Sequence, residues 1–130
     1  MINNEIKFLA TNINCYTEDQ VLIIGISNDL IFPNNYLILS RFDEDEDEDE
    51  GDVDESIGIQ THLTEIEVAK AVKSIVLKKN TLTIEINKHK TEQIQAKKII
   101  IEFNELDNTL LIKYINDIFS DSSATVIINV

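Results

Sequence analysis

Residues 73–86 read KSIVLKKNTLTIEI, and this stretch has the clearest strand pattern in the chain. In its second half, TLTIEI, every other residue is apolar, which is typical of a strand with one buried face and one exposed face. The two halves flank the polar pair Lys79-Asn80, so the stretch predicts a β-hairpin. A half-buried hairpin of this kind indicates an antiparallel sheet.

Apolar, β-branched segments predict further strands on both sides of this hairpin. These strands cover residues 5–13, 21–26, 36–42, 56–62, 97–103 and 124–130. Residues 16–20 are polar and predict a turn. Residues 63–71, LTEIEVAKA, fit a short helix and an irregular edge equally well.

One helix is predicted near the end of the chain. Asn104 is a good N-cap, with Glu105 and Asp107 in the first turn. From Leu106 to Phe119, apolar residues recur at spacings of three and four, the pattern of an amphipathic helix. The predicted fold class is α+β: a single antiparallel β-sheet with a C-terminal amphipathic helix packed on one face. At 130 residues, the chain predicts a single domain, residues 1–130, with an acidic loop at 43–55.

The negative charge is concentrated in one place. Eleven of the thirteen residues from Asp43 to Glu55, here called the acidic run, are Asp or Glu. The chain has 24 Asp and Glu residues and 11 Lys and Arg residues. Outside the run, thirteen acidic residues therefore remain to balance eleven basic ones. The formal charge of −13 therefore comes from a nearly neutral body with one acidic segment.

This charge distribution excludes some partners and favours others. Binding to nucleic acid or to an anionic membrane needs clustered Lys and Arg, which the sequence lacks. The N-terminus has no secretion signal, no apolar stretch approaches the ~18 residues of a membrane span, and the single cysteine fits a reducing compartment. A cytoplasmic protein with a basic partner is expected, and exposed strand edges leave a homodimer open.

The acidic run has three interpretations. It could be an inert, solvated loop. It could bind calcium, but placing Gly51 at the glycine position of a helix–loop–helix site puts Ile57 where the closing carboxylate belongs. It could also attract a basic macromolecule. Uncompensated charge between two strands lowers stability through self-repulsion, which suggests that the charge has a function. Arg41, the only arginine, lies just before the run, with only Phe42 between them; it either anchors the base of the loop or contacts the partner.

Candidate catalytic residues are few. Cys15 has no second cysteine beside it and no sign of thiolate activation. His62 lies in a predicted strand as a partly buried polar residue, and His89 is expected to be exposed between two lysines. No phosphate-binding loop, HExxH or GxSxG motif is present. We therefore expect a protein that is not an enzyme and uses no cofactor and no metal, with Cys15 or His62 as the residues of an enzymatic alternative.

Three segments together resemble a known family. YLILSR at 36–41, KSIVLKKNTLTIEI at 73–86 and IEFNELDN at 101–108, with an acidic connection after the first, are similar to the immunity protein 10 family of bacterial polymorphic toxin systems. The resemblance extends from about residue 6 to about residue 120. It implies an α+β domain that protects its producer by binding a cognate toxin domain, with no catalytic residues and no cofactor.

The expected function is therefore that of an immunity protein, which binds and neutralises a basic toxin domain stoichiometrically. The alternative is a divalent-cation-responsive or structural interaction module that uses the acidic loop. The predicted partner-binding residues are Arg41, Asp43, Glu44, Asp45, Glu46, Asp47, Glu48, Asp49, Glu50, Asp52, Asp54 and Glu55.

Overall fold

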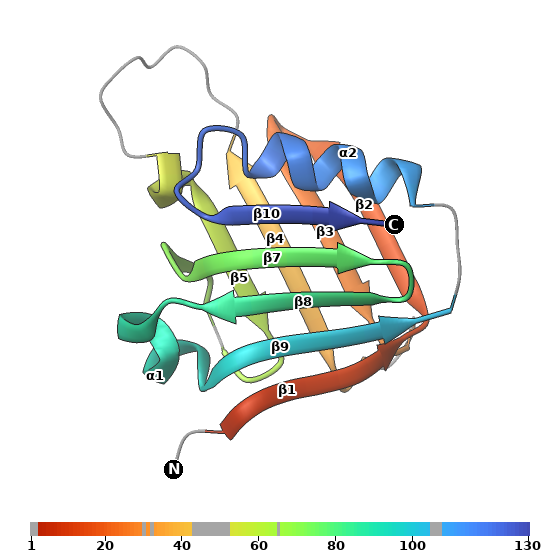
Figure 1. Ribbon diagram of the computed structural model, residues 1–130, viewed down its shortest axis with the longest axis horizontal. Coiled ribbons are helices and arrows are strands. Elements are labelled where there is room, and N and C mark those ends of the chain that lie inside the picture. The colour runs from red at the N-terminus through yellow and green to blue at the C-terminus, as the bar shows by residue number, and fades with distance from the viewer. Residues whose placement is uncertain (1–2, 30, 32, 43–52, 65, 105–107) are drawn as a thin grey trace.

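The protein is mainly β. The computed structural model describes residues 3–29, 31, 33–42, 53–64, 66–104 and 108–130. Strands hold 55% of the described residues and helices 19%. The strands form two five-stranded sheets that lie face to face, one in front of the other in Figure 1.

Sheet A combines antiparallel and parallel pairs. It consists of β1 (Asn3–Ala10), β7 (Val72–Lys78), β8 (Thr81–Ile86), β9 (Ala96–Phe103) and β10 (Thr125–Asn129). The strand order is β1-β9-β8-β7-β10. The three central strands are antiparallel, whereas the edge strands β1 and β10 run parallel to their neighbours. The predicted hairpin is confirmed as β7 and β8.

Sheet B is antiparallel throughout and follows the order of the sequence. It consists of β2 (Asn12–Glu18), β3 (Val21–Ser27), β4 (Tyr36–Phe42), β5 (Ile57–Thr61) and β6 (Val68–Ala69). The turn between β2 and β3 is Asp19-Gln20, and both residues have positive φ, 54° and 69°. Two left-handed residues give a turn whose twist matches that of the flanking strands.

The core lies between the two sheets. Strands of sheet A cross those of sheet B at a steep angle (Figure 1), and the inward-facing side chains of both are almost entirely aliphatic. They include Ile24, Leu39 and Ile59 from sheet B and Ile75, Ile84 and Ile99 from sheet A. Burying a large aliphatic side chain stabilises the fold by about 1.5–3 kcal/mol, so this layer dominates the stability.

The chain passes from sheet A to sheet B at a corner. Only Thr11 separates β1 from β2. Its N–H donates to the carbonyl of Ser27 at 2.9 Å, and its hydroxyl donates to the carbonyl of Asn28 at 3.0 Å. These hydrogen bonds satisfy the backbone polar groups where the chain turns. Because β1 and β2 are both edge strands, the chain at Thr11 links the edges of the two sheets covalently.

The main helix, α2 (Thr109–Ile118), lies along the side of the sandwich next to β10, across the ends of sheet B strands (Figure 1). It buries Leu111, Ile115 and Ile118. The predicted N-cap at Asn104 is wrong, because the cap is Asn108, one turn later. Glu105 and Asp107 lie outside the described residues. Shorter helical segments are η1 (Val53–Ser56), η2 (Lys88–Lys90) and α1 (Thr91–Ile94).

The predicted fold class, a single antiparallel sheet with a C-terminal helix on one face, is wrong. The strands divide between two sheets, and the core lies between these sheets rather than between one sheet and α2. Most strands lie where they were predicted, but β2 was missed: the predicted strand 5–13 is divided between β1 and β2, and the turn expected at 16–20 is confined to Asp19-Gln20. Alternation of side chains also does not reveal which strands pair. The parallel pairs of β1 with β9 and of β7 with β10 join residues far apart in the sequence.

Candidate functional site

Arg41 lies at the end of β4 and binds the C-terminal end of α2. Its Nη1 group donates to the carbonyl oxygens of Asp117 at 3.3 Å, Ile118 at 2.9 Å and Ser120 at 2.7 Å. The last carbonyls of a helix have no partner within the helix and carry partial negative charge. The partly buried guanidinium therefore caps α2. These contacts explain the position of Arg41 but do not test its predicted role in partner binding.

Asp54 ties the other end of the acidic run to the same part of the molecule. Its carboxylate accepts hydrogen bonds from the Ser122 hydroxyl at 2.6 Å and from the Ser123 N–H at 3.2 Å, and also from the Ser123 hydroxyl. Both serines lie in the segment that follows α2, four and five residues after its end. Arg41, two residues before the run, and Asp54, near the end of the run, thus both bind the segment 117–123, and we call this arrangement the clamp.

The pKa of Asp54 reflects these contacts. Partial burial raises it, but the hydrogen bonds from Ser122 and Ser123 and the charge of Lys70 outweigh burial, so the pKa lies below the ordinary value of 3.8. A lowered folded-state pKa means that the ionised carboxylate stabilises the fold above the ordinary pKa. This stabilisation is lost as the pH falls through the lower, folded-state value.

The clamp predicts that neutralising Asp54 lowers the free energy of unfolding more than neutralising its neighbour Glu55. At pH 7, Asp54→Asn is expected to lower the free energy of unfolding by about 1 kcal/mol, allowing for solvent screening of charge-assisted hydrogen bonds. The loss should disappear as the pH falls through the lowered folded-state pKa of Asp54, because the wild-type carboxylate is then protonated as well. Urea unfolding over a series of pH values from 7 downward measures this dependence.

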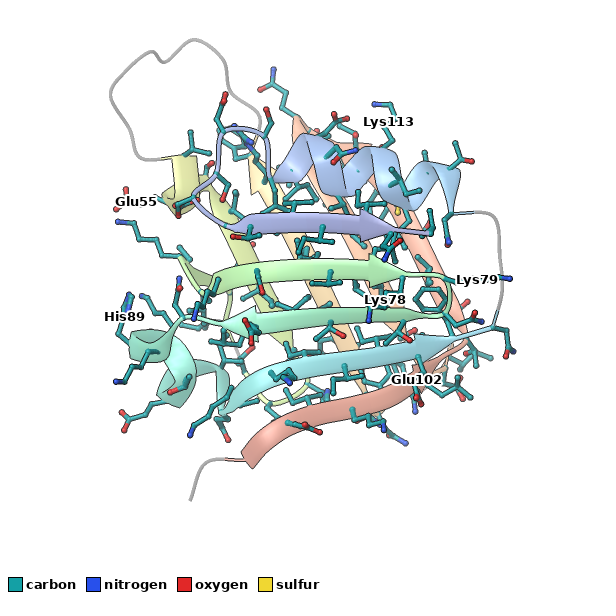
Figure 2. All side chains as sticks on the ribbon, viewed as in Figure 1. Glu55, Lys78, Lys79, His89, Glu102 and Lys113 are labelled. Carbon is teal, nitrogen blue, oxygen red and sulfur yellow. The ribbon has the colours of Figure 1, made fainter. Side chains whose placement is uncertain are left out.

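Glu55→Gln is the matched control, since it removes the same charge one residue away. The Glu55 carboxylate lies 3.5 Å from Lys70 Nζ; the Glu55 side chain is 64% exposed and the Lys70 side chain 40%. Figure 2 shows Glu55 at the surface. Exposed pairs of this kind contribute about 0–1 kcal/mol. Equal effects of the two substitutions at pH 7 would show that the clamp contacts of Asp54 contribute nothing specific.

The remaining predicted partner-binding residues, Asp43–Glu50 and Asp52, lie outside the described residues. Among the residues that the structure does describe, no group of three His, Cys, Asp or Glu side chains is placed to hold a metal ion. None of the helices in the described ranges is long and apolar enough to cross a membrane.

Cys15 lies on the inward side of β2 and packs against the core. Burial raises the pKa of its thiol to about 11. Since the thiolate is the reactive form, almost none of Cys15 is nucleophilic at neutral pH. The environment is that of a small apolar side chain, not of an activated cysteine.

The buried position of Cys15 predicts slow alkylation. At pH 7.5 the thiolate fraction should be about 100-fold lower than that of an exposed thiol, because the pKa is about two units above the ordinary 9.0. Iodoacetamide should therefore modify the native protein about 100-fold more slowly than the protein unfolded in urea. Equal rates, measured by mass spectrometry, would contradict the burial of this thiol.

His62 contributes to packing and to one backbone hydrogen bond. Its Nδ1 accepts the N–H of Tyr36 at 3.2 Å, so this nitrogen carries no proton. The rings of Phe8 and Tyr36 contact the imidazole edge-on, at centroid distances of 6.4 Å and 6.1 Å. The prediction of a partly buried polar residue is confirmed. His89, in η2, is exposed as predicted (Figure 2).

The sequence interpretation missed an apolar surface on sheet B. Strands β2, β3 and β4 turn Tyr16, Ile23, Ile38 and Phe42 away from the core. A groove of about 530 Å³ lies on this side and is lined mainly by apolar atoms around Gly25. The signal was present in the sequence, because VLIIGI and YLIL are continuously apolar and do not alternate. Such runs are typical of strands with two apolar faces.

The geometry combines an acidic segment with clamped ends, a structural arginine and an apolar outer face on sheet B. No protein-family model matches the sequence, and no curated protein matches it at a significant level. The functional interpretation therefore depends on the residues themselves.

Proposed function

We propose that this protein is an immunity protein, which binds a basic toxin domain and neutralises it stoichiometrically in the cytoplasm. The observation that carries the proposal is the concentration of charge: eleven acids stand in the thirteen-residue acidic run, while the rest of the chain is nearly neutral. A localised anionic segment accelerates encounter with a cationic partner and orients it. The resemblance of three segments to immunity protein 10 sequences points to the same function.

The clamp supports a role for the run in binding. Arg41, just before the run, and Asp54, near its end, both bind the segment 117–123. The described residues at the two ends of the run are therefore attached to a folded body. A partner that meets the run also meets the surface beside it.

The described side chains with catalytic potential favour binding over catalysis. The Cys15 thiol is protonated at neutral pH because burial raises its pKa, and His62 uses Nδ1 for a backbone hydrogen bond. Toxin domains that act on nucleic acid are expected to be basic, since they must neutralise phosphates. An anionic protein can block such a surface without any chemistry of its own.

A neutralisation assay tests the proposal. The probe is the C-terminal domain of the multidomain toxin expected from the adjacent upstream gene, expressed from an inducible promoter. Co-expression of this protein should restore growth, and the two purified chains should form a one-to-one complex in size-exclusion chromatography. Toxicity that persists at equal expression of both chains would refute the proposed function.

Calcium titration separates the proposal from the cation-responsive alternative. The proposed function predicts only weak, millimolar calcium binding, as any dense carboxylate segment gives. A stoichiometric micromolar site in isothermal titration calorimetry, lost when residues 43–50 are replaced by Ser and Gly, would favour the cation-responsive module instead.

A further inference from the structure

The outer faces of the two sheets differ in polarity. On sheet A, the outward side chains are mainly charged or polar, although Leu9 (52% exposed) and Ile127 (48% exposed) also lie on this face (Figure 2). The charged residues of this face are Glu5, Lys7, Lys78, Glu85, Lys98 and Glu102. On sheet B about half of the outward positions of β2–β4 are apolar or aromatic, and these are Tyr16, Val21, Ile23, Tyr36, Ile38 and Phe42. Tyr16 is 39% exposed and Phe42 is 45% exposed, so this surface is accessible to a partner.

A hollow at Gly25 gives the outer face of sheet B its shape. Gly25 pairs with Asn14 on one side and with Ile38 on the other, so a missing side chain leaves a gap in the middle of a row. Gly25 lines the groove of about 530 Å³, together with Tyr16 and Ile23. Glycine weakens a strand interior and often marks close approach of another molecule.

Two of the described residues at the border of this face are acidic. Glu18 ends β2, and the Glu67 side chain lies over Gly58 and accepts a hydrogen bond from the Ser40 hydroxyl. The only basic residue in the strands of sheet B is Arg41, which points inward to α2. In the sequence, the acidic run begins directly after Phe42. The face therefore has an apolar centre and an anionic border.

We propose that the outer face of sheet B is the docking surface for the toxin domain, with a protruding apolar side chain of the partner in the groove over Gly25 and basic residues around it. This inference deepens the proposed function and rests on it. Three strands of seven residues present about 300 Å². That area suits the apolar centre of a standard interface of about 800 Å² per partner, with a charged rim.

The negative charge of the protein favours a basic toxin domain over a second copy of the chain as the partner of this face. In a symmetric dimer through this face, the same acidic border would meet itself. With a charge of −13 on each copy, repulsion would oppose that contact, whereas a basic partner gains from the same border. A cationic surface with an exposed apolar anchor is the complement of this face.

Two variants test the docking surface without disturbing the fold. Gly25→Val fills the groove: an added Cβ would meet only the Asn14 carbonyl oxygen at 3.9 Å, and Gly25 has no positive φ. Its melting temperature should stay equal or rise, because valine suits a strand better than glycine. Ile23→Lys places a cation on the apolar face, and Val76→Lys is its control at an outward position of sheet A.

Binding of each variant to the toxin domain is measured by surface plasmon resonance, alongside growth rescue and analytical ultracentrifugation. Gly25→Val should weaken the complex by about 10-fold and Ile23→Lys by about 100-fold, while Val76→Lys stays within about 2-fold of the wild type. If the wild type rescues growth and both sheet B variants bind normally, the docking surface is refuted but the proposed function stands.

Other outcomes also refute the docking surface. Failure of rescue by the wild type removes the proposed function, and the docking surface with it. A wild-type dimer that Ile23→Lys converts to a monomer would assign the face to a second copy. Saturable binding of the neutral dye Nile red, lost in Gly25→Val while toxin binding is kept, would assign the groove to a small apolar ligand.

Discussion

Replacing residues 43–50 by Ser and Gly is expected to slow association with the toxin domain by about 10- to 100-fold at low ionic strength. Eight of the acids in the run are lost in this variant, and with them most of the long-range attraction to a cationic partner. The difference should shrink as salt is added, because the Debye length falls from about 30 Å at 0.01 M to about 3 Å at 1 M. Stopped-flow association rates at several salt concentrations measure the effect.

Stability should change in the opposite direction. Removing self-repulsion among eight acids is expected to leave the melting temperature equal or higher. A matched pair of double variants controls for total charge: Asp43→Asn with Glu44→Gln in the run, and Glu5→Gln with Glu102→Gln on the outer face of sheet A. If the two pairs slow association equally, the effect follows net charge and the position of the run has no importance.

Arg41→Met is expected to destabilise the fold more than Asp54→Asn does. It leaves three carbonyls at the end of α2 without their charged donor, and hydrogen bonds to charged groups contribute about 1.5–3 kcal/mol. We expect a loss of about 2 kcal/mol, or about 8 °C in melting temperature for a chain of this length. Hydrogen exchange should accelerate first at the C-terminal turn of α2 and in residues 120–123.

Lys113→Met provides the control for Arg41→Met on the same helix. Lys113 Nζ lies 2.8 Å from an Asp117 carboxylate oxygen in an exposed pair four residues apart (Figure 2). Such pairs contribute about 0.3–0.5 kcal/mol. A cost for Arg41→Met as small as that for Lys113→Met would show that the guanidinium does not cap α2 in solution.

Most strands could be located from the sequence, but their pairing into two sheets could not be predicted. Alternation in TLTIEI and the polar Lys79-Asn80 between two apolar arms are local signals, and the hairpin they predicted is confirmed. The two-sheet arrangement depends on the corner at Thr11 and on parallel pairs between distant segments, which leave no local pattern. Asn104 and Asn108 both suit an N-cap, and the choice between them depends on tertiary packing.

The site shows the same division between local and distant information. The acidic run is visible in the composition alone, whereas the contacts of Arg41 and Asp54 reach residues nearly seventy or more positions away. The outer face of sheet B could have been inferred from the continuous apolar runs VLIIGI and YLIL. It was missed because the predicted single sheet with a helix on one face already accounted for the apolar side chains.

The parallel pairing of β10 has a consequence for biosynthesis. Thr125 pairs with Ser74, so sheet A gains this edge only after β10 has left the ribosome, about 50 residues after β7. Contacts between distant residues form late and slow folding. A nascent chain thus exposes the edge of β7 until β10 emerges, and a variant that cannot form β10 would leave that strand open to aggregation.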